Sequence, residues 1–162
     1  MRGGAGLLMV PMATDLGGII VEHPNATRIR NLFVAGNAGD FEAADALAAD
    51  DIIWINDIGA GPWHELVGKQ AVLEFSMNWQ VLFDGTWTYD ILDACGSDSS
   101  VVLVMREHGV ARGLQFDNHT LYHFSLDSDG RVERIQTYDR DREAIIAFWQ
   151  AIGPVATSPA TE

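Results

Sequence analysis

The 162-residue sequence predicts a single α+β domain, in which a curved, mainly antiparallel sheet wraps around helices gathered near the N-terminus. Three segments with apolar residues at helical spacing come early in the chain, interrupted by one short β-branched and aromatic run. Four long runs rich in β-branched and aromatic residues follow with short connections, which is typical of an antiparallel sheet. Long strands in a small domain curl, and a curled sheet closed by helices leaves a cavity for a small ligand.

The expected early helices begin and end at residues with suitable local chemistry. The first covers about 25–36 and begins at Asn25, a residue type that caps helix N-termini well. The second is shorter, begins at Asp40 and ends before 50–51. The third covers about 69–83 and carries its apolar side chains on one side.

The remaining elements are strands and one closing helix. A four-residue acidic and glycine-containing turn at 127–130 has hairpin chemistry and separates the last two strands. A helix over 141–152 is expected to close the domain. The expected strands are 52–55, 86–95, 100–110, 113–126 and 132–138.

These elements place the domain at 23–152. Residues 1–22 contain an apolar run that Pro11 and Asp15 interrupt, so we expect a disordered or loosely docked tail rather than a signal peptide. Residues 153–162 contain glycine, proline and serine and are expected to form a second tail.

Charge and cysteine content limit the classes of partner. Ten basic and 23 acidic residues give a net charge of −13, which argues against nucleic acid and membrane surfaces as partners. The single cysteine, Cys95, cannot form an internal disulfide, so a reducing compartment such as the cytoplasm is expected. The sequence has no phosphate-binding loop, no Cys-x-x-Cys pair and no nucleophilic serine signature, so nothing in it implies a cofactor.

The order of elements, together with four short motifs, resembles the nuclear transport factor 2-like superfamily. The motifs are NAGDF at 37–41, ADD at 49–51, GKQAV at 68–72 and DGRV at 129–132. The sequence is most similar to the ketosteroid isomerase, SnoaL-type polyketide cyclase and limonene epoxide hydrolase branches. This resemblance implies a cone-shaped mixed sheet around a pocket for a small apolar molecule, with a homodimer formed through the outer face of the sheet.

The resemblance to ketosteroid isomerases carries over only in part. Their aspartate base falls on Asn56, with Asp57 next to it, and only one of these neighbours can face inward. Their oxyanion tyrosine falls on Leu32, which cannot donate a hydrogen bond, and their oxyanion aspartic acid falls on Tyr122, which can. If Asp57 faces inward it is a candidate base; if Asn56 does, it would hold a water or a substrate oxygen.

The resemblance to epoxide hydrolases places other residues at the same pocket. Their water-holding Tyr and Asn fall on Trp54 and Asn56, and their Arg-x-Asp falls on Arg106 and His108. Their second aspartate, like the catalytic aspartate of the SnoaL-type cyclases, falls near Gln136.

Arg106 and His108 are two residues apart on an apolar strand, so both side chains project from the same face. If that face is inward, His108 could transfer a proton and Arg106 could stabilise negative charge. The alternative is an exposed strand end with both residues solvated. On the next strand, Tyr122 could donate to an oxyanion or be a core tyrosine with a local partner.

The sequence therefore predicts a cofactor-independent acid–base enzyme of isomerase or cyclase type, acting on a polyketide, terpenoid or steroid-like compound. Epoxide hydrolysis or dehydration in the same pocket, and a non-catalytic binding or assembly module, stay open as alternatives. The expected catalytic residues are Asn56, Asp57, Arg106, His108 and Tyr122. The expected substrate-binding residues are Trp54, Phe75, Trp79, Phe83, Asn118, Gln136 and Tyr138.

Overall fold

A computed structural model describes residues 22–154, except 39, 41, 57, 59, 60 and 62. Most of the two expected tails and Asp57 therefore lie outside the described residues. None of the helices described is long and apolar enough to cross a membrane. The elements are α1 (Pro24–Asn37), α2 (Glu42–Leu47), β1 (Ala48–Asn56), β2 (Glu65–Val67), α3 (Lys69–Leu82), β3 (Thr88–Gly96), β4 (Ser100–Ala111), β5 (Leu114–Leu126), β6 (Val132–Asp139) and α4 (Arg142–Ile152).

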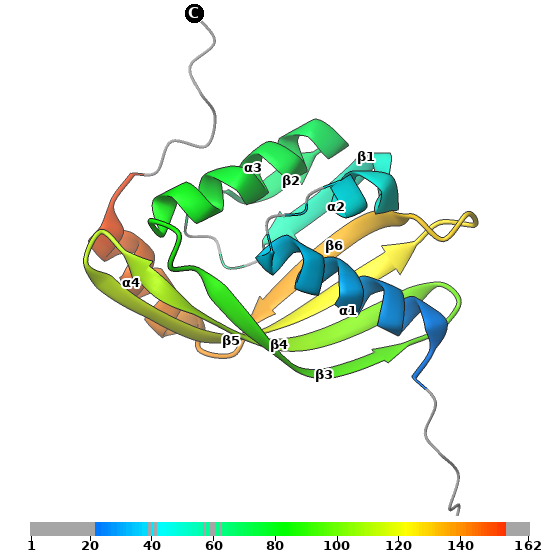
Figure 1. Ribbon diagram of the computed structural model, residues 1–162. Helices are drawn as coiled ribbons and strands as arrows, with labels where there is room; N and C mark the ends of the chain where they lie inside the picture. The colour runs from blue at the N-terminus through cyan, green and yellow to red at the C-terminus, as the bar shows by residue number, and fades with distance from the viewer. Residues whose placement is uncertain are drawn as a thin grey trace, which may run out of the picture.

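The described strands form one six-stranded sheet in the order β2-β1-β6-β5-β4-β3. β1 runs parallel to β6, and every other neighbouring pair is antiparallel. The sheet curves beneath α1, α2 and α3, which lie over one of its faces (Figure 1). The predicted fold class, an α+β fold with a mixed and mainly antiparallel curved sheet, is confirmed.

Two local predictions in the first half of the chain were wrong. Ala48 and Ala49 belong to β1 rather than to the end of the second helix, because both are buried and Ala48 pairs with Val132. The short strand β2, which pairs Val67 with Ile53, was not among the expected strands. Three residues are too few to show a strand pattern, so only the pairing with β1 defines β2.

Irregular positions along the strands accompany the curvature of the sheet. The register of β3 against β4 shifts between Ile91 and Asp93, as in a β-bulge, which bends a strand locally. β4 and β5 are joined by a tight turn with positive φ at Arg112 and Gly113, 52° and 82°. A two-residue turn of this kind matches the twist of long paired strands.

The inner face of the sheet changes from apolar to polar along its two longest strands. On β4, Val101, Leu103 and Met105 are completely buried, and Glu107 follows them on the same face. On β5, Tyr122 is followed toward the strand's beginning by Thr120 and Asn118, all of them buried. The polar side chains therefore meet in the interior, next to the apolar core.

Candidate functional site

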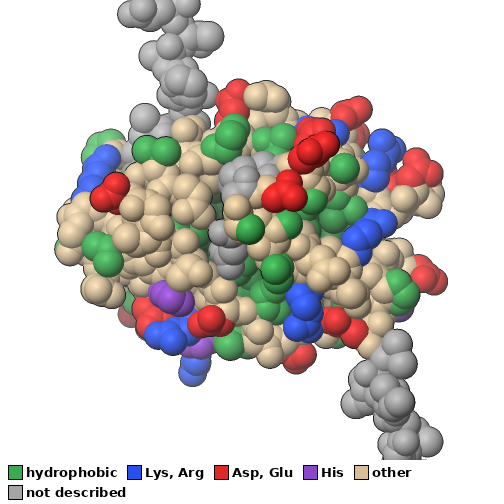
Figure 2. All heavy atoms as spheres, viewed as in Figure 1, with side chains coloured by type: hydrophobic (Ala, Val, Ile, Leu, Met, Phe, Trp, Pro, Cys, Tyr) green, Lys and Arg blue, Asp and Glu red, His purple; other side chains and the backbone are tan. Residues whose placement is uncertain are grey.

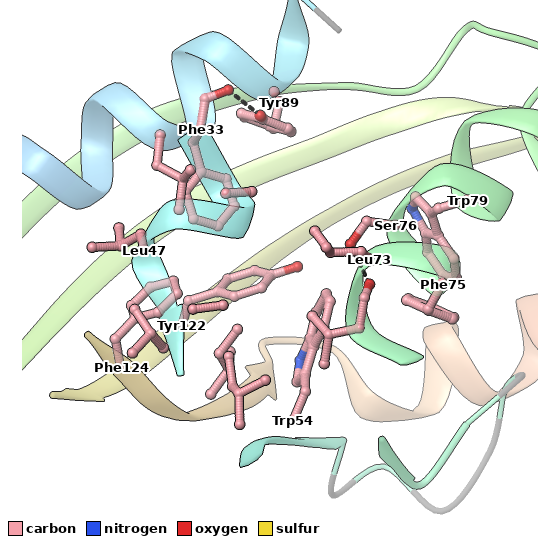
Figure 3. A pocket seen from close by; sticks show the side chains of 18 of the residues that line it. Phe33, Leu47, Trp54, Leu73, Phe75, Ser76, Trp79, Tyr89, Tyr122 and Phe124 are labelled. Atoms are coloured by element: carbon pink, nitrogen blue, oxygen red, sulfur yellow. Dashed lines mark hydrogen bonds between the residues drawn. The ribbon is translucent and has the colours of Figure 1, made fainter. Parts of the chain in front are cut away.

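A cavity of about 170 Å³ lies between the inner face of the sheet and the helices α1, α2 and α3. Its wall is mostly apolar and rich in aromatic rings: α1 contributes Phe33, β1 contributes Trp54, and α3 contributes Phe75 and Trp79. Figure 3 shows the ring of Tyr122 reaching up from the sheet between Phe33 and Trp54. The structure thus places three of the expected pocket residues, Trp54, Phe75 and Trp79, around a common hollow.

Trp63, in the segment before β2, completes this wall and was missed by the sequence analysis. Its ring centroid lies 4.3 Å from that of Phe75, 5.3 Å from that of Trp79 and 5.6 Å from that of Trp54. Edge and tilted contacts at these distances are favourable for aromatic pairs. The four rings therefore form one packed surface drawn from β1, α3 and the intervening loop.

One carboxylic acid, Glu107 of β4, faces the cavity and is buried. Its Oε1 accepts a hydrogen bond from the Tyr122 hydroxyl at 2.6 Å, and its Oε2 accepts one from the Thr120 hydroxyl at 2.6 Å. Both donors come from β5, the neighbouring strand. Hydrogen bonds to a carboxylate are short and strong, so the two hydroxyl groups fix the orientation of the acid.

The environment of Glu107 sets its proton affinity near neutrality. The pKa of Glu107 is raised from 4.5 to about 7, chiefly by burial and to a lesser extent by the nearby negative charge of Asp139. The hydrogen bonds from Thr120 and Tyr122 act in the opposite direction and lower it. A carboxylic acid with a pKa near the working pH can both take and return a proton, as general acid–base catalysis requires.

Tyr122 itself remains a hydrogen-bond donor. Burial, followed by the charge of Glu107, raises the pKa of the Tyr122 hydroxyl well above its ordinary value. The hydroxyl therefore keeps its proton at every pH at which Glu107 changes its own charge. Of the expected catalytic residues that the structure describes, Tyr122 is the one that lies in the cavity wall.

The polar network extends from Glu107 to β6. Asn118 Nδ2 donates to Thr120 Oγ1 at 2.8 Å and to Asp139 Oδ1 at 2.5 Å. Burial is the largest cause of the raised pKa of Asp139, which the hydrogen bonds from Asn118 and Thr120 oppose. The N-terminus of α4 is capped by Asp141, which accepts a hydrogen bond from the Ala144 N–H at 3.0 Å, so Asp139 is not needed as a cap.

Arg106 and His108 point away from the cavity, which corrects the expectation that they face it. Arg106 is exposed and binds the carboxylate of Asp117 through its Nε at 2.8 Å. His108 Nε2 lies 3.6 Å from an oxygen of Asp90, also on the outer face. Successive residues of a strand face opposite sides, so placing these two outward places Glu107 inward.

On β6, too, the residues that face the cavity differ by one position from those that were expected to face it. Ile135 lines the cavity, so Gln136 lies on the other face of the strand, and the side chain of Tyr138 is exposed. Gln136 and Tyr138 were expected to line the pocket. Asn118 faces inward as expected, but it bonds Thr120 and Asp139 instead of lining the cavity.

Asn56 and Phe83 face inward without reaching the cavity wall. The Asn56 side chain is buried and its Oδ1 accepts a hydrogen bond from the Ile58 N–H at 3.1 Å, so it stabilises the turn after β1. Phe83 is completely buried in a second apolar cluster, against Phe116 and Trp87. Asp57, the alternative to Asn56, lies outside the described residues.

A curved sheet closed by helices over an apolar cavity defines a nuclear transport factor 2-like protein. The SnoaL-like domain matches residues 29–135, and the chain belongs to this family. No curated protein sequence matches the chain.

Solved structures share the fold at low sequence identity. Bal32a, from a soil-derived mobile gene cassette, has a TM-score of 0.72 and 22% identity, over 77% of this chain and 95% of its own. TerC, co-crystallised with polyporic acid, has a TM-score of 0.65 and 17% identity, over 80% and 98%. An LEH-like epoxide hydrolase from M. tuberculosis has a TM-score of 0.60 and 17% identity, over 78% and 92%. These likenesses establish the fold, which hosts several chemistries.

Replacing Tyr122 by phenylalanine is expected to raise the pKa of Glu107 above its wild-type value. The substitution removes a hydrogen bond that favours the charged carboxylate, while the ring and its burial remain. The pKa is measured by carbon-13 NMR of the labelled glutamate carboxyl groups, with Glu107→Gln identifying the signal. Tyr89→Phe is the matched control, because the Tyr89 hydroxyl donates to the Phe33 carbonyl. An unchanged or lower pKa in Tyr122→Phe would contradict the assigned hydrogen bond.

Proposed function

We propose that this protein is a cofactor-independent acid–base enzyme of isomerase or cyclase type, acting on a small, apolar, oxygenated molecule. One observation carries the proposal: the carboxyl group of Glu107 is buried in the wall of an aromatic cavity, with a pKa of about 7. A base of this kind removes a proton next to a carbonyl group and returns it elsewhere. Burial and aromatic walls keep water from competing for that proton.

The size of the cavity supports a compact substrate. Its volume of about 170 Å³ is close to that of an engineered apolar cavity of about 150 Å³ that binds benzene. One six-membered ring therefore fills the space next to Glu107. Hydrophobic residues on α1, β2 and α3 are exposed on the helix-covered side, where Figure 2 shows hydrophobic side chains at the surface. These exposed residues are Val34, Val67, Met77 and Val81, and none of them lines the cavity.

Two indole groups in the cavity wall support a substrate that carries an oxygen atom. The Nε1 atoms of Trp54 and Trp63 are buried and have no hydrogen-bond partner within the described part of the chain. Leaving such a donor unpaired costs about 1–3 kcal/mol, which a bound acceptor would recover. A carbonyl or epoxide oxygen is an acceptor of the required kind.

A non-catalytic binding site is the second candidate. The hydroxyl of Ser76, one of the few polar groups in the wall, is already bonded to the Val72 carbonyl at 2.8 Å. Arg106 and His108 contribute nothing to the cavity. A hollow with so few polar groups would bind an apolar molecule with or without chemistry.

Isomerisation of cyclohex-3-enone to its conjugated isomer tests the proposal. The base takes the proton between the carbonyl group and the double bond and returns it to the far carbon, so no other reactant is consumed. The wild-type protein is expected to form the conjugated enone, detected by its ultraviolet absorbance, faster than buffer alone. Because the reactive form of Glu107 is the carboxylate, the rate is expected to rise with pH through about 7.

Cyclohexene oxide, assayed in parallel by diol formation, tests epoxide hydrolysis in the same cavity. Calorimetric titration with both compounds measures binding independently of turnover. Binding without turnover of either compound would support the non-catalytic candidate against the enzyme. A rate of enone formation that falls as pH rises through about 7 would contradict Glu107 as the base.

A further inference from the structure

We propose that Thr120 and Asp139 form a proton relay that connects Glu107 to solvent through a second hollow next to β6 and α4, apart from the substrate cavity. This inference rests on the proposed function, since it describes how Glu107 would exchange its proton while a substrate fills the cavity. The residues of the relay come from three neighbouring strands, β4, β5 and β6.

The hydrogen bonds form a continuous path. Thr120 Oγ1 lies 2.6 Å from Glu107 Oε2 and 3.4 Å from Asp139 Oδ1. Thr120 and Asp139 are direct partners in the register of β5 and β6, so the backbone holds this pair together. Asn118 Nδ2 binds both Thr120 Oγ1 and Asp139 Oδ1, at 2.8 Å and 2.5 Å. Its amide therefore fixes the middle and the end of the path at once.

The far end of the path opens into a second hollow. This hollow, of about 90 Å³, is lined by Asp139 and Arg142 together with Ile58, Thr137 and Tyr138. Asp139 is partly exposed there, and Arg142 and Tyr138 are exposed. A volume of this size has room for water, which requires roughly 10–15 Å³ per molecule on the same kind of measure. Asp139 can therefore exchange protons with water without passing through the substrate cavity.

The relay step conserves every atom and charge. When Glu107 has taken a proton from substrate, its carboxylic acid group donates to Thr120 Oγ1. The Thr120 hydroxyl, which donates to Glu107 Oε2 while Glu107 is charged, turns toward Asp139 Oδ1, 3.4 Å away. Its proton then passes to the Asp139 carboxylate as Thr120 Oγ1 receives the proton from Glu107. The products are a Glu107 carboxylate, an unchanged Thr120 hydroxyl and a protonated Asp139, which releases its proton to water in the second hollow.

The groups that face the relay favour this exchange. Tyr122 on β5 donates to Glu107, and Tyr89 on β3, opposite Glu107 in the sheet register, donates to the Phe33 carbonyl. Burial raises the pKa of Asp139. The positive charge of Arg142, at the start of α4, lowers it. Burial raises the pKa of both acids, so each holds a proton more readily than an exposed carboxyl group does.

A pH jump followed by time-resolved infrared spectroscopy measures the relay without a substrate. The carbonyl band of protonated Glu107 is identified by its absence in Glu107→Gln. The buffer is saturated with benzene, which fills the apolar cavity and excludes water from that side. Thr120→Val, which has a similar shape but no hydroxyl, is expected to slow proton exchange at Glu107 by at least about tenfold. Asp139→Asn, which cannot carry the proton, is expected to slow it similarly.

Thr120→Ser is the matched control, because it restores the hydroxyl and is expected to restore most of the wild-type rate. Exchange in Thr120→Val that is as fast as in wild type would overturn the relay. Slow exchange in Thr120→Ser would also overturn it, since packing rather than the hydroxyl would then be responsible. Because no turnover is measured, failure of the relay is distinguishable from failure of the enzyme: inactivity toward cyclohex-3-enone leaves the exchange rates unaffected.

Discussion

Glu107→Gln is expected to lower the rate of cyclohex-3-enone isomerisation by about 10²- to 10⁴-fold, the usual contribution of a general base. Glutamine has almost the shape of glutamate. Its amide oxygen can accept from the Tyr122 hydroxyl, and its amide nitrogen can donate to Thr120 Oγ1, so the site keeps its geometry. The amide cannot take a proton from carbon. The loss is therefore expected in kcat, with the dissociation constant of the ketone nearly unchanged.

Steady-state kinetics measures kcat, and calorimetric titration of the same preparations measures the dissociation constant of the ketone. His108→Ala and Arg106→Ala are the matched controls, since both alter ionisable groups of the same strand on its outer face. Both are expected to keep wild-type kcat. Full activity of Glu107→Gln, or loss of activity in His108→Ala, would contradict the assignment of Glu107 as the general base.

The fold could be predicted because its signals are local and repeated. The apolar spacing of the segment that became α3 and the long β-branched runs that became β3 to β6 each indicate one kind of element. The predictions were wrong where the pairing of strands, rather than the helix or strand propensity of the residues, decides the structure. Ala48 and Ala49 suit a helix, yet they extend β1 because they are buried beside β6.

The face of a strand is harder to predict when both faces are apolar. On β4, residues 101–105 are all apolar, although only every second one is completely buried. The sequence therefore gives no alternation from which to decide whether Glu107 or its two neighbours turn inward. The signal that could decide it lies on the next strand: Asp117 pairs with Arg106 on the outer face, and Tyr122 supplies a donor on the inner face.

Trp63 and Asp139 could not be predicted because their roles depend on contacts distant in sequence. Trp63 lies in a loop without periodicity, and its partners Phe75 and Trp79 belong to the following helix. Asp139 lies three residues before the start of α4, a region where an acidic residue is commonly a cap. Its actual partner, Asn118, is 21 residues away and is brought close only by the pairing of β5 with β6.

The stability of the wild-type protein is expected to decrease with pH, relative to Glu107→Gln, between about 4.5 and about 7. In this interval the folded chain holds the proton of Glu107, whereas the unfolded chain has released it. The contribution is fully present below about pH 4.5 and is lost as pH rises through about 7. A pKa raised from 4.5 to about 7 corresponds to about 3 kcal/mol.

Urea denaturation of both proteins at about pH 4 and about pH 8 measures this difference. Glutamine carries no charge, so the variant lacks the cost of burying a carboxylate, and the effects of the other ionisable groups largely cancel in the comparison. The difference between the two free energies of unfolding, variant minus wild type, is expected to increase by about 3 kcal/mol from the lower to the higher pH. A difference independent of pH would mean that Glu107 ionises in the folded protein as readily as in water. The acid would then lack the proton affinity that the proposed chemistry requires.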